Sequence, residues 1–203
     1  MFPILASVFV ISLSGVLQPG IMLAINIAKS FRSPWAGVWI SLGHMVIELP
    51  IILLVYYGFA RFFQNTIVQI VLSILGGGMI VWMGIAMFRA RKEVVLKGRD
   101  LPYNAFIAGI LTSALNPFFW LWWATIGSML VMRIIDFNLG GLIALTLVHW
   151  LCDLVWLALI SVLVYRTHSL WGSRLQEWLF IGCALLLVGF GGWYFVSGVS
   201  LVF

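Results

Sequence analysis

Charged residues are scarce in this chain. Of its 203 residues, 8% are charged and 64% are hydrophobic, and the mean hydropathy is +1.15. Soluble globular domains contain roughly 25% charged residues, so this composition excludes a soluble protein. Long apolar runs recur along the whole sequence and leave no room for a separate soluble domain. We therefore expect a single polytopic membrane domain that covers residues 1–203.

The chain has few cysteines, and it lacks the sequence motifs of redox proteins, metalloenzymes and secreted proteins. The two cysteines, Cys152 and Cys183, form no C-x-x-C motif, which argues against a metal motif or a redox pair. The chain has no His-Glu-x-x-His run and no nucleophile beside a base, so we expect neither an enzyme nor a cofactor. No basic segment precedes the first apolar run, so we expect no signal peptide. The net charge is +5, but the basic residues lie in short connections, and we expect no nucleic-acid partner.

Six apolar runs are each long enough to cross a bilayer, which takes about 20 helical residues. Backbone groups in lipid must be hydrogen-bonded within their own segment, and the runs lack the alternation of barrel strands. The expected fold class is therefore an all-α integral membrane protein with six transmembrane helices. The runs cover approximately residues 4–28, 36–60, 67–88, 103–132, 139–165 and 176–202.

Two of these runs contain matching polar stretches. Residues 41–49 read Ser-Leu-Gly-His-Met-Val-Ile-Glu-Leu, and residues 146–154 read Thr-Leu-Val-His-Trp-Leu-Cys-Asp-Leu, at an offset of 105. In each stretch a carboxylate follows a histidine by four residues, so both side chains lie on one helix face. An ionisable group at membrane depth costs roughly 2.5–3.5 kcal/mol on insertion scales, so a duplicated pair indicates a working site. The four residues are His44, Glu48, His149 and Asp153.

Three interpretations of these histidine–carboxylate pairs are open. A buried carboxyl group beside an imidazole can exchange a proton, as proton coupling requires, and we favour this interpretation. Two histidines and two carboxylates can also bind a divalent transition metal. The pairs could instead be hydrogen-bonded clasps between helices, each contributing about 1–2 kcal/mol.

The two halves of the chain match at further positions. Gln18-Pro19 in the first run corresponds to Asn116-Pro117 in the fourth, and Gly-Gly runs at 77 and 191 also correspond. The offsets rise in order, 98, 105 and 114, as a duplication with small insertions would give. Because each half has three spans, the second half must enter the membrane upside down, a common plan of secondary transporters. We expect repeat 1 at about residues 1–90, repeat 2 at about 103–203 and a basic cytoplasmic loop at about 89–102.

The prolines predict a break in the first and fourth helices. Proline removes one helical hydrogen bond and clashes with the preceding turn. An opened helix near the midplane presents carbonyl groups and a half-helix N-terminus to a substrate, and we favour this role over a packing kink because the break occurs twice. The tryptophans that follow the second break could line a pocket or simply pack in the membrane. The candidate substrate-binding residues are Gln18, Pro19, Gly20, Asn116, Pro117 and Trp120, and Ser14, Asn26 and Thr112 are further cavity candidates.

The distribution of lysine and arginine predicts the orientation. The connections after the first, third and fifth spans hold nine of these residues, and those after the second and fourth hold two. Because basic connections stay in the cytoplasm, we expect both termini outside and a multi-pass protein of the plasma membrane.

Several short motifs, in this order, resemble the lysine exporter (LysE/RhtB-type) translocators. They are Ser14-Gly-Val-Leu-Gln-Pro-Gly20, Gly37, Gly43 and Ala114-Leu-Asn-Pro117, and the two histidine–acid stretches look like an archaeal branch of that family. The resemblance covers essentially the whole chain. It implies a homodimeric six-span exporter that moves amino acids or related small metabolites outward, in exchange for protons or down a gradient.

The chain departs from the family pattern at two positions near the breaks. It has Ile21 where many members have a second proline, and Phe118 where many have lysine. Related redox carriers need paired cysteines beside the two prolines, and this chain has none there. A divalent metal exporter that uses His44, Glu48, His149 and Asp153 is the alternative to an amino acid exporter.

Overall fold

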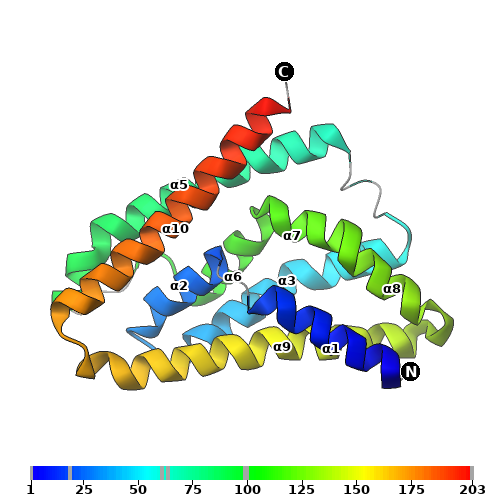
Figure 1. The fold of residues 1–203 in the computed structure, drawn as a ribbon, viewed down its shortest axis with the longest axis horizontal. Coiled ribbons are helices and arrows are strands. Elements are labelled where there is room, and N and C mark those ends of the chain that lie inside the picture. Colours follow the sequence, from blue (N-terminus) through cyan, green and yellow to red (C-terminus); the bar gives the residue numbers. More distant parts are fainter. Residues whose placement is uncertain (1, 18–19, 60–61, 63–64, 98–100, 202–203) are drawn as a thin grey trace.

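The chain forms helices and connections in a computed structural model, which describes residues 2–17, 20–59, 62, 65–97 and 101–201, and of residues 14, 93–97, 117 and 118 only the backbone. These residues contain no strand, which confirms the all-α prediction (Figure 1). The long helices are α1 (Phe2–Val16), α2 (Ile21–Ser30), α3 (Ala36–Tyr56), α5 (Thr66–Lys97), α6 (Ala105–Ala114), α9 (Asn138–Thr167) and α10 (Ser173–Ser200). The shorter segments are α7 (Pro117–Trp122), the π-helix η1 (Trp123–Gly127), α8 (Ser128–Ile134) and the 3₁₀ turns η2 (Ile135–Phe137) and η3 (His168–Leu170).

Four helical stretches of the described chain are long and apolar enough to cross a membrane. The longest has 52 residues and reverses direction between α8 and α9 (Figure 1), where Asn138 takes a φ of 52°. The first expected span consists of two shorter apolar helices, α1 and α2, and the fourth begins with the short helix α6. The four stretches are Ala36–Tyr56, Thr66–Lys92, Phe119–Leu170 and Ser173–Ser200.

Both expected helix breaks coincide with gaps between helices. α1 ends at Val16 and α2 begins at Ile21, although Gln18 and Pro19 themselves lie outside the described residues. α6 ends at Ala114, and α7 begins at Pro117 as a proline-initiated helix can, because the first helical residue needs no amide donor.

Glycines bring the central helix α3 against its neighbours α6 and α9. A Cβ atom added to Gly43 would lie 2.1 Å from the carbonyl oxygen of Phe106 on α6. One added to Gly37 would lie 2.0 Å from that of Leu157 on α9. These contacts leave no room for a side chain, so they hold the polar stretch of α3 close to both helices.

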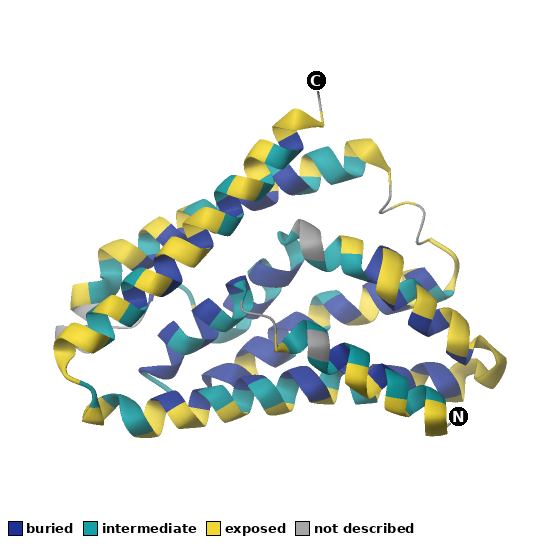
Figure 2. Ribbon diagram, in the orientation of Figure 1, coloured by how far each residue is buried: buried dark blue, intermediate teal, exposed yellow. Residues whose placement is uncertain are grey.

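The helices α5 and α10 form a pair that lies along one side of the molecule (Figure 1). The Gly-Gly runs meet here: a Cβ atom on Gly77 would lie 2.6 Å from the carbonyl oxygen of Gly191. The outward faces of both helices are exposed, as expected for lipid contact (Figure 2).

The buried side chains form two apolar clusters, and the polar stretches lie between them. On α3, Ile40 belongs to one cluster and Ile51 to the other, so the residues at 44 and 48 lie between the two. On α9, Leu157 and Leu145 bracket the residues at 149 and 153 in the same way. The ionisable groups are therefore surrounded by apolar packing.

Candidate functional site

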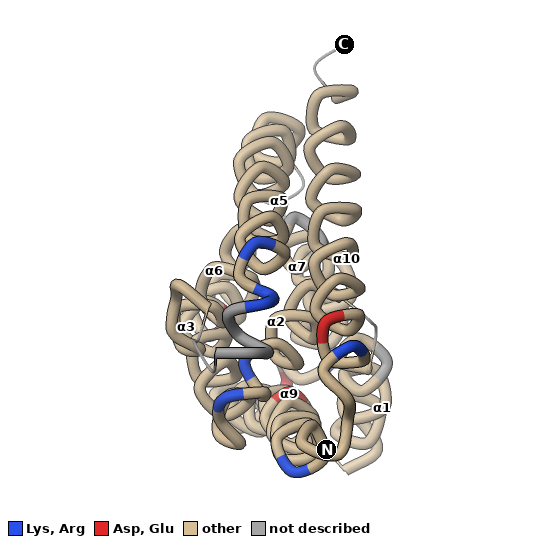
Figure 3. Tube along the Cα trace, turned by 90° about the vertical axis from the view of Figure 1, so that its left-hand side faces the viewer, with Lys and Arg blue, Asp and Glu red and all other residues tan. Residues whose placement is uncertain are grey.

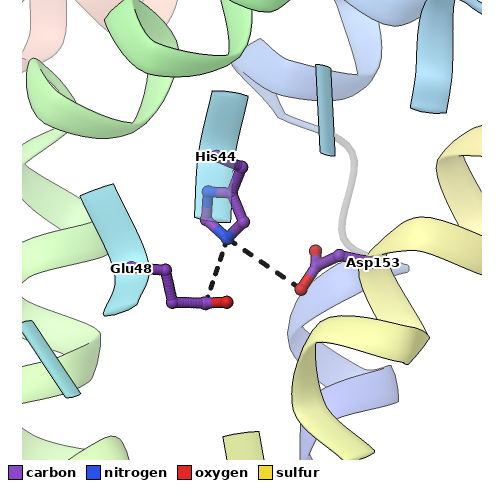
Figure 4. Close-up of side chains that lie close together, drawn as sticks. All are labelled: His44, Glu48 and Asp153. Atoms are coloured by element: carbon purple, nitrogen blue, oxygen red, sulfur yellow. Dashed lines mark hydrogen bonds and ion pairs between the residues drawn. The ribbon is translucent and has the colours of Figure 1, made fainter. Parts of the chain in front are cut away.

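The four ionisable residues predicted from the sequence meet in one buried cluster. His44 and Glu48 come from α3, and His149 and Asp153 come from α9, which packs against it. All four residues are buried, with exposures of 1–7%. Figure 4 shows His44 with both carboxylates facing it, one from its own helix and one from α9.

The two carboxylates are not equivalent. Oε1 of Glu48 lies 3.0 Å from Nε2 of both His44 and His149, which is hydrogen-bonding distance. Oδ2 of Asp153 lies 3.9 Å from the same two nitrogens, which is too far for a hydrogen bond. Glu48 therefore bridges the histidines, whereas Asp153 interacts with them only through charge.

Each histidine is held at its other ring nitrogen by a serine. Nδ1 of His44 lies 2.6 Å from Oγ of Ser113 on α6, and Nδ1 of His149 lies 2.7 Å from Oγ of Ser12 on α1. Both serines precede a helix break by a few residues. The helices that precede the two breaks are thus in direct contact with the histidine–carboxylate cluster.

The hydrogen bonds of Ser113 fix the proton on His44. The Ser113 hydroxyl donates to the carbonyl oxygen of Gly109 at 2.7 Å, and a hydroxyl has one hydrogen to donate. Ser113 must therefore accept from His44, so Nδ1 of His44 carries a proton.

It follows that the contact between His44 and Glu48 contains a further proton. Because Nδ1 of His44 is already protonated, the 3.0 Å contact at Nε2 needs a hydrogen on either the imidazole or the carboxyl group. His149 has no such requirement, since the described residues give the Ser12 hydroxyl no other acceptor. That hydroxyl can donate to Nδ1 of His149, and Nε2 of a neutral His149 can then donate to Glu48. The geometry therefore requires one proton between His44 and Glu48.

Aromatic rings enclose the histidines. The ring of Trp122 stacks on His149 with centroids 5.1 Å apart, and Trp123 meets it edge-on at 5.1 Å. Phe119 meets His44 edge-on at 5.2 Å. Trp123 begins η1, and such π-helical segments are frequent at functional sites.

A cavity of about 260 Å³ opens beside the cluster. This volume is near the lower limit of small-molecule pockets, roughly 300 Å³, so the cavity fits a ligand of about the size of an amino acid. All four ionisable residues line it, together with Gly20 and Asn116 of the two breaks, and Phe190, Trp193 and Tyr194 of α10 complete its aromatic wall.

The other residues predicted from the sequence to bind substrate either lie outside the described residues or make contacts away from the cavity. Gln18, Pro19 and the side chains of Ser14 and Pro117 lie outside the described residues. Trp120 is not among the described residues that line the cavity, and its indole nitrogen donates to the carbonyl oxygen of Ala114 across the second break. Thr112 donates to a carbonyl group of its own helix.

Asn26 belongs to a second polar cluster, which joins α2, α3 and α9. Its side-chain nitrogen donates to the carbonyl oxygen of Leu157 at 2.9 Å, and its side-chain oxygen accepts from Ser161 at 2.8 Å. The Ser161 hydroxyl oxygen also accepts from the backbone amide of Gly37 at 2.6 Å. This cluster fastens α2 to α9, and Asn26 and Ser161 are not among the described residues that line the cavity.

The ionisable cluster has the chemistry of a cation site. One ligand atom each from His44, Glu48 and Asp153 lie within 4.8 Å of one another. The serine contacts leave Nε2 of both histidines directed at the carboxylates, as outer-shell partners do for metal-binding histidines.

Phe119 and two groups of other site residues were not identified from the sequence. Ser12 and Ser113 lie close to Ser14 and Thr112, which were named, and only the helix packing distinguishes them. The aromatic residues of α10 lie in a uniformly apolar run, so nothing in the sequence distinguishes those that face the cavity from those that face lipid.

A comparison with protein families found one that covers most of the chain. The family model described as LysE type translocator matches residues 13–198. Searches of the curated proteins and of the solved structures found no match.

Proposed function

Since the chain belongs to the LysE type translocator family, we propose that it exports an amino acid or a related small metabolite in exchange for protons. The family and the several apolar helices identify a multi-pass membrane exporter of such compounds. Proton coupling and alternating access go beyond the family match and are proposed here from the site.

The observation that carries the proposal is the 3.0 Å contact between His44 and Glu48 at the wall of the cavity, which requires a proton. His44 and Glu48 share one proton there, and Asp153 lies beside them without a hydrogen bond to either histidine. A cationic group of a substrate would be attracted to the same carboxylates, so substrate and proton compete for one site. Competition at a site that opens to one side of the membrane at a time gives exchange of one for the other.

The test is substrate-driven proton movement in liposomes that contain the purified protein and a pH-sensitive dye. We expect an amino acid to drive proton flux in the wild type, and we expect Glu48→Gln combined with Asp153→Asn to abolish it. Elution of the variant as a single folded species in detergent is the control. Full flux in this double variant would remove both carboxylates from the mechanism.

We also propose that the chain consists of two inverted three-span halves, as the matching offsets suggest. α1 with α2 would form one broken span, and α6 with α7 and α8 the other. The basic residues support a cytoplasmic location for one end of the molecule, where they gather (Figure 3). α1 begins and α10 ends away from that end (Figure 1), consistent with both termini outside the plasma membrane. The homodimer implied by the family resemblance belongs to this proposal, and light scattering in detergent would test it.

Export of a divalent metal is the second candidate. It is favoured by the three ligand atoms within 4.8 Å and by the serine-held histidines. In the same liposomes, proton flux that responds to divalent metals and to no amino acid would establish this function in place of the first.

A further inference from the structure

The N-terminus of α2 faces the same cavity as the carboxylates. α2 has ten residues, begins at Ile21 and is capped by no side chain. Its first intrahelical hydrogen bond runs from the amide of Ala24 to the carbonyl oxygen of Gly20, so the amides before Ala24 have no helical acceptor. Such a helix start carries a partial positive charge and binds anionic groups. The residues of this helix start that line the cavity are Gly20, Ile21, Met22 and Leu23.

A second and independent feature of the cavity also calls for a ligand. Glu48 is 1% exposed and Asp153 is 7% exposed, and both line the cavity. Oε2 of Glu48 and Oδ2 of Asp153 are buried and accept no hydrogen bond from any described residue. Buried carboxylate oxygens without donors are costly, and a primary ammonium group supplies three donors.

The lining of the cavity thus includes both the amides of a helix start, which suit an anion, and a pair of carboxylates, which suit a cation. No lysine or arginine is among the described residues that line it, so a substrate carboxylate finds neither of these cations there. The amides at the start of α2 are donors that also carry the partial positive charge of a helix N-terminus. Apart from the Glu48–Asp153 pair, the described lining contains no acidic group that could receive a second substrate cation. Phe190, Trp193 and Tyr194 form a wall suited to an apolar group.

We propose that the cavity binds a zwitterionic amino acid with an apolar side chain. Its carboxylate accepts hydrogen bonds from the first amides of α2, its ammonium group donates to Glu48 and Asp153, and its side chain packs against the aromatic residues of α10. This inference rests on the proposed function and specifies the substrate class of the same site.

The test compares compounds that lack one group each. The purified full chain in detergent is incubated with radiolabelled L-leucine and competed with 3-methylbutylamine, which lacks the carboxylate, 4-methylpentanoate, which lacks the ammonium group, and L-lysine. We expect the concentration that displaces half of the bound radiolabelled leucine to be at least tenfold higher for each competitor than for unlabelled leucine. Equal competition by the amine would overturn the carboxylate subsite, and equal competition by lysine would overturn the apolar one.

The binding experiment can fail while the proposed function holds, so the two proposals are tested separately. Absence of saturable leucine binding overturns the present inference, whereas the proposed function fails only if no amino acid or metabolite drives proton flux in liposomes. Equal binding of amine and amino acid, together with proton flux, would leave the exporter in place and remove this subsite.

A backbone variant tests the helix N-terminus directly. Ile21→Pro deletes the first amide donor of α2, and proline is well accommodated at a first helical position. Gly20 before it is extended, with φ −158° and ψ −172°, as residues before proline tend to be. Ile21→Ala removes the same side chain and keeps the amide. We expect leucine affinity to be about five- to tenfold lower in Ile21→Pro than in Ile21→Ala, with similar melting temperatures. Equal affinities of these two variants would refute the assignment.

Discussion

The two carboxylates of the cluster should differ sharply in what they contribute to stability. Glu48 lies within hydrogen-bonding distance of both histidines, at 3.0 Å, whereas Asp153 lies 3.9 Å from both and forms no hydrogen bond with them. Glu48→Gln keeps an oxygen acceptor but removes its charge. Asp153→Asn removes a buried charge that has no hydrogen bond to lose at Oδ2.

The magnitudes follow from these contacts. A hydrogen bond to a charged group contributes about 1.5–3 kcal/mol and is roughly twice as strong as a neutral one. Loss of the charge on Glu48 therefore costs about 1 kcal/mol or more for each histidine, or about 2–3 kcal/mol in total. In a chain of this size, 1 kcal/mol lowers the melting temperature by about 2–4 °C, so we expect Glu48→Gln to melt about 5–10 °C below the wild type. For Asp153→Asn the relief of desolvation offsets the lost attraction, and we expect a change within about 2 °C or a small increase.

The assay is thermal unfolding of the purified proteins in detergent, followed by the loss of the monodisperse peak on size-exclusion chromatography. Glu177→Gln is the matched control, because it makes the same chemical change at a partly exposed residue near the start of α10. We expect it to melt within about 2 °C of the wild type. A larger loss of stability in Asp153→Asn than in Glu48→Gln would refute the assignment of Glu48 as the bridge between the histidines.

Three further predictions concern packing and orientation. Gly43→Ala should cost about 2 kcal/mol or more in stability, because its Cβ atom would lie 2.1 Å from a backbone oxygen. Gly182→Ala, whose Cβ atom would have nothing within 4 Å, should instead stabilise by about 0.5–1 kcal/mol. Thermal unfolding compares the two variants, and equal effects would contradict the close contact of α3 and α6. Ser161→Ala should cost about 1–3 kcal/mol, because it leaves the buried amide of Gly37 without its acceptor, and a melting temperature equal to that of the wild type would argue against the second polar cluster. A cysteine at Arg89 should react with an impermeant maleimide only from the cytoplasm and one at Arg133 only from outside, and the reverse pattern would invert the proposed orientation.

The sequence was sufficient to predict which four ionisable residues come together and where they lie along the chain. The four-residue spacing of histidine and carboxylate, repeated in two apolar runs, predicted a polar cluster of His44, Glu48, His149 and Asp153, and these residues do meet. The break before Pro117 followed from the chemistry of proline in the same way. Both predictions depend on local rules that hold within one helix.

The division of roles within the cluster could not be predicted, because it depends on distances between helices. In the sequence, Glu48 and Asp153 occupy equivalent positions in their stretches. In the structure, the glutamate, with one more methylene group, reaches both histidines, and the shorter aspartate does not. The separation of α3 and α9 decides this, and it is set by the contact of Gly37 with the backbone at Leu157.

The serine contacts suggest how the cluster and the cavity are coupled. His44 on α3 is oriented by Ser113 on α6, and His149 on α9 is oriented by Ser12 on α1, so each proposed half holds the histidine of the other. Each serine lies just before a helix break that lines the cavity. A ligand that moved either broken helix would therefore move the acceptor of the Nδ1 proton on His44, or the donor to Nδ1 of His149. The proton between His44 and Glu48 depends on the first of these contacts, so we expect its release to be more sensitive to Ser113→Ala than to Ser12→Ala. Proton flux per substrate in liposomes would compare the two variants, and equal stoichiometries would show that the serine contacts do not couple the proton to the substrate.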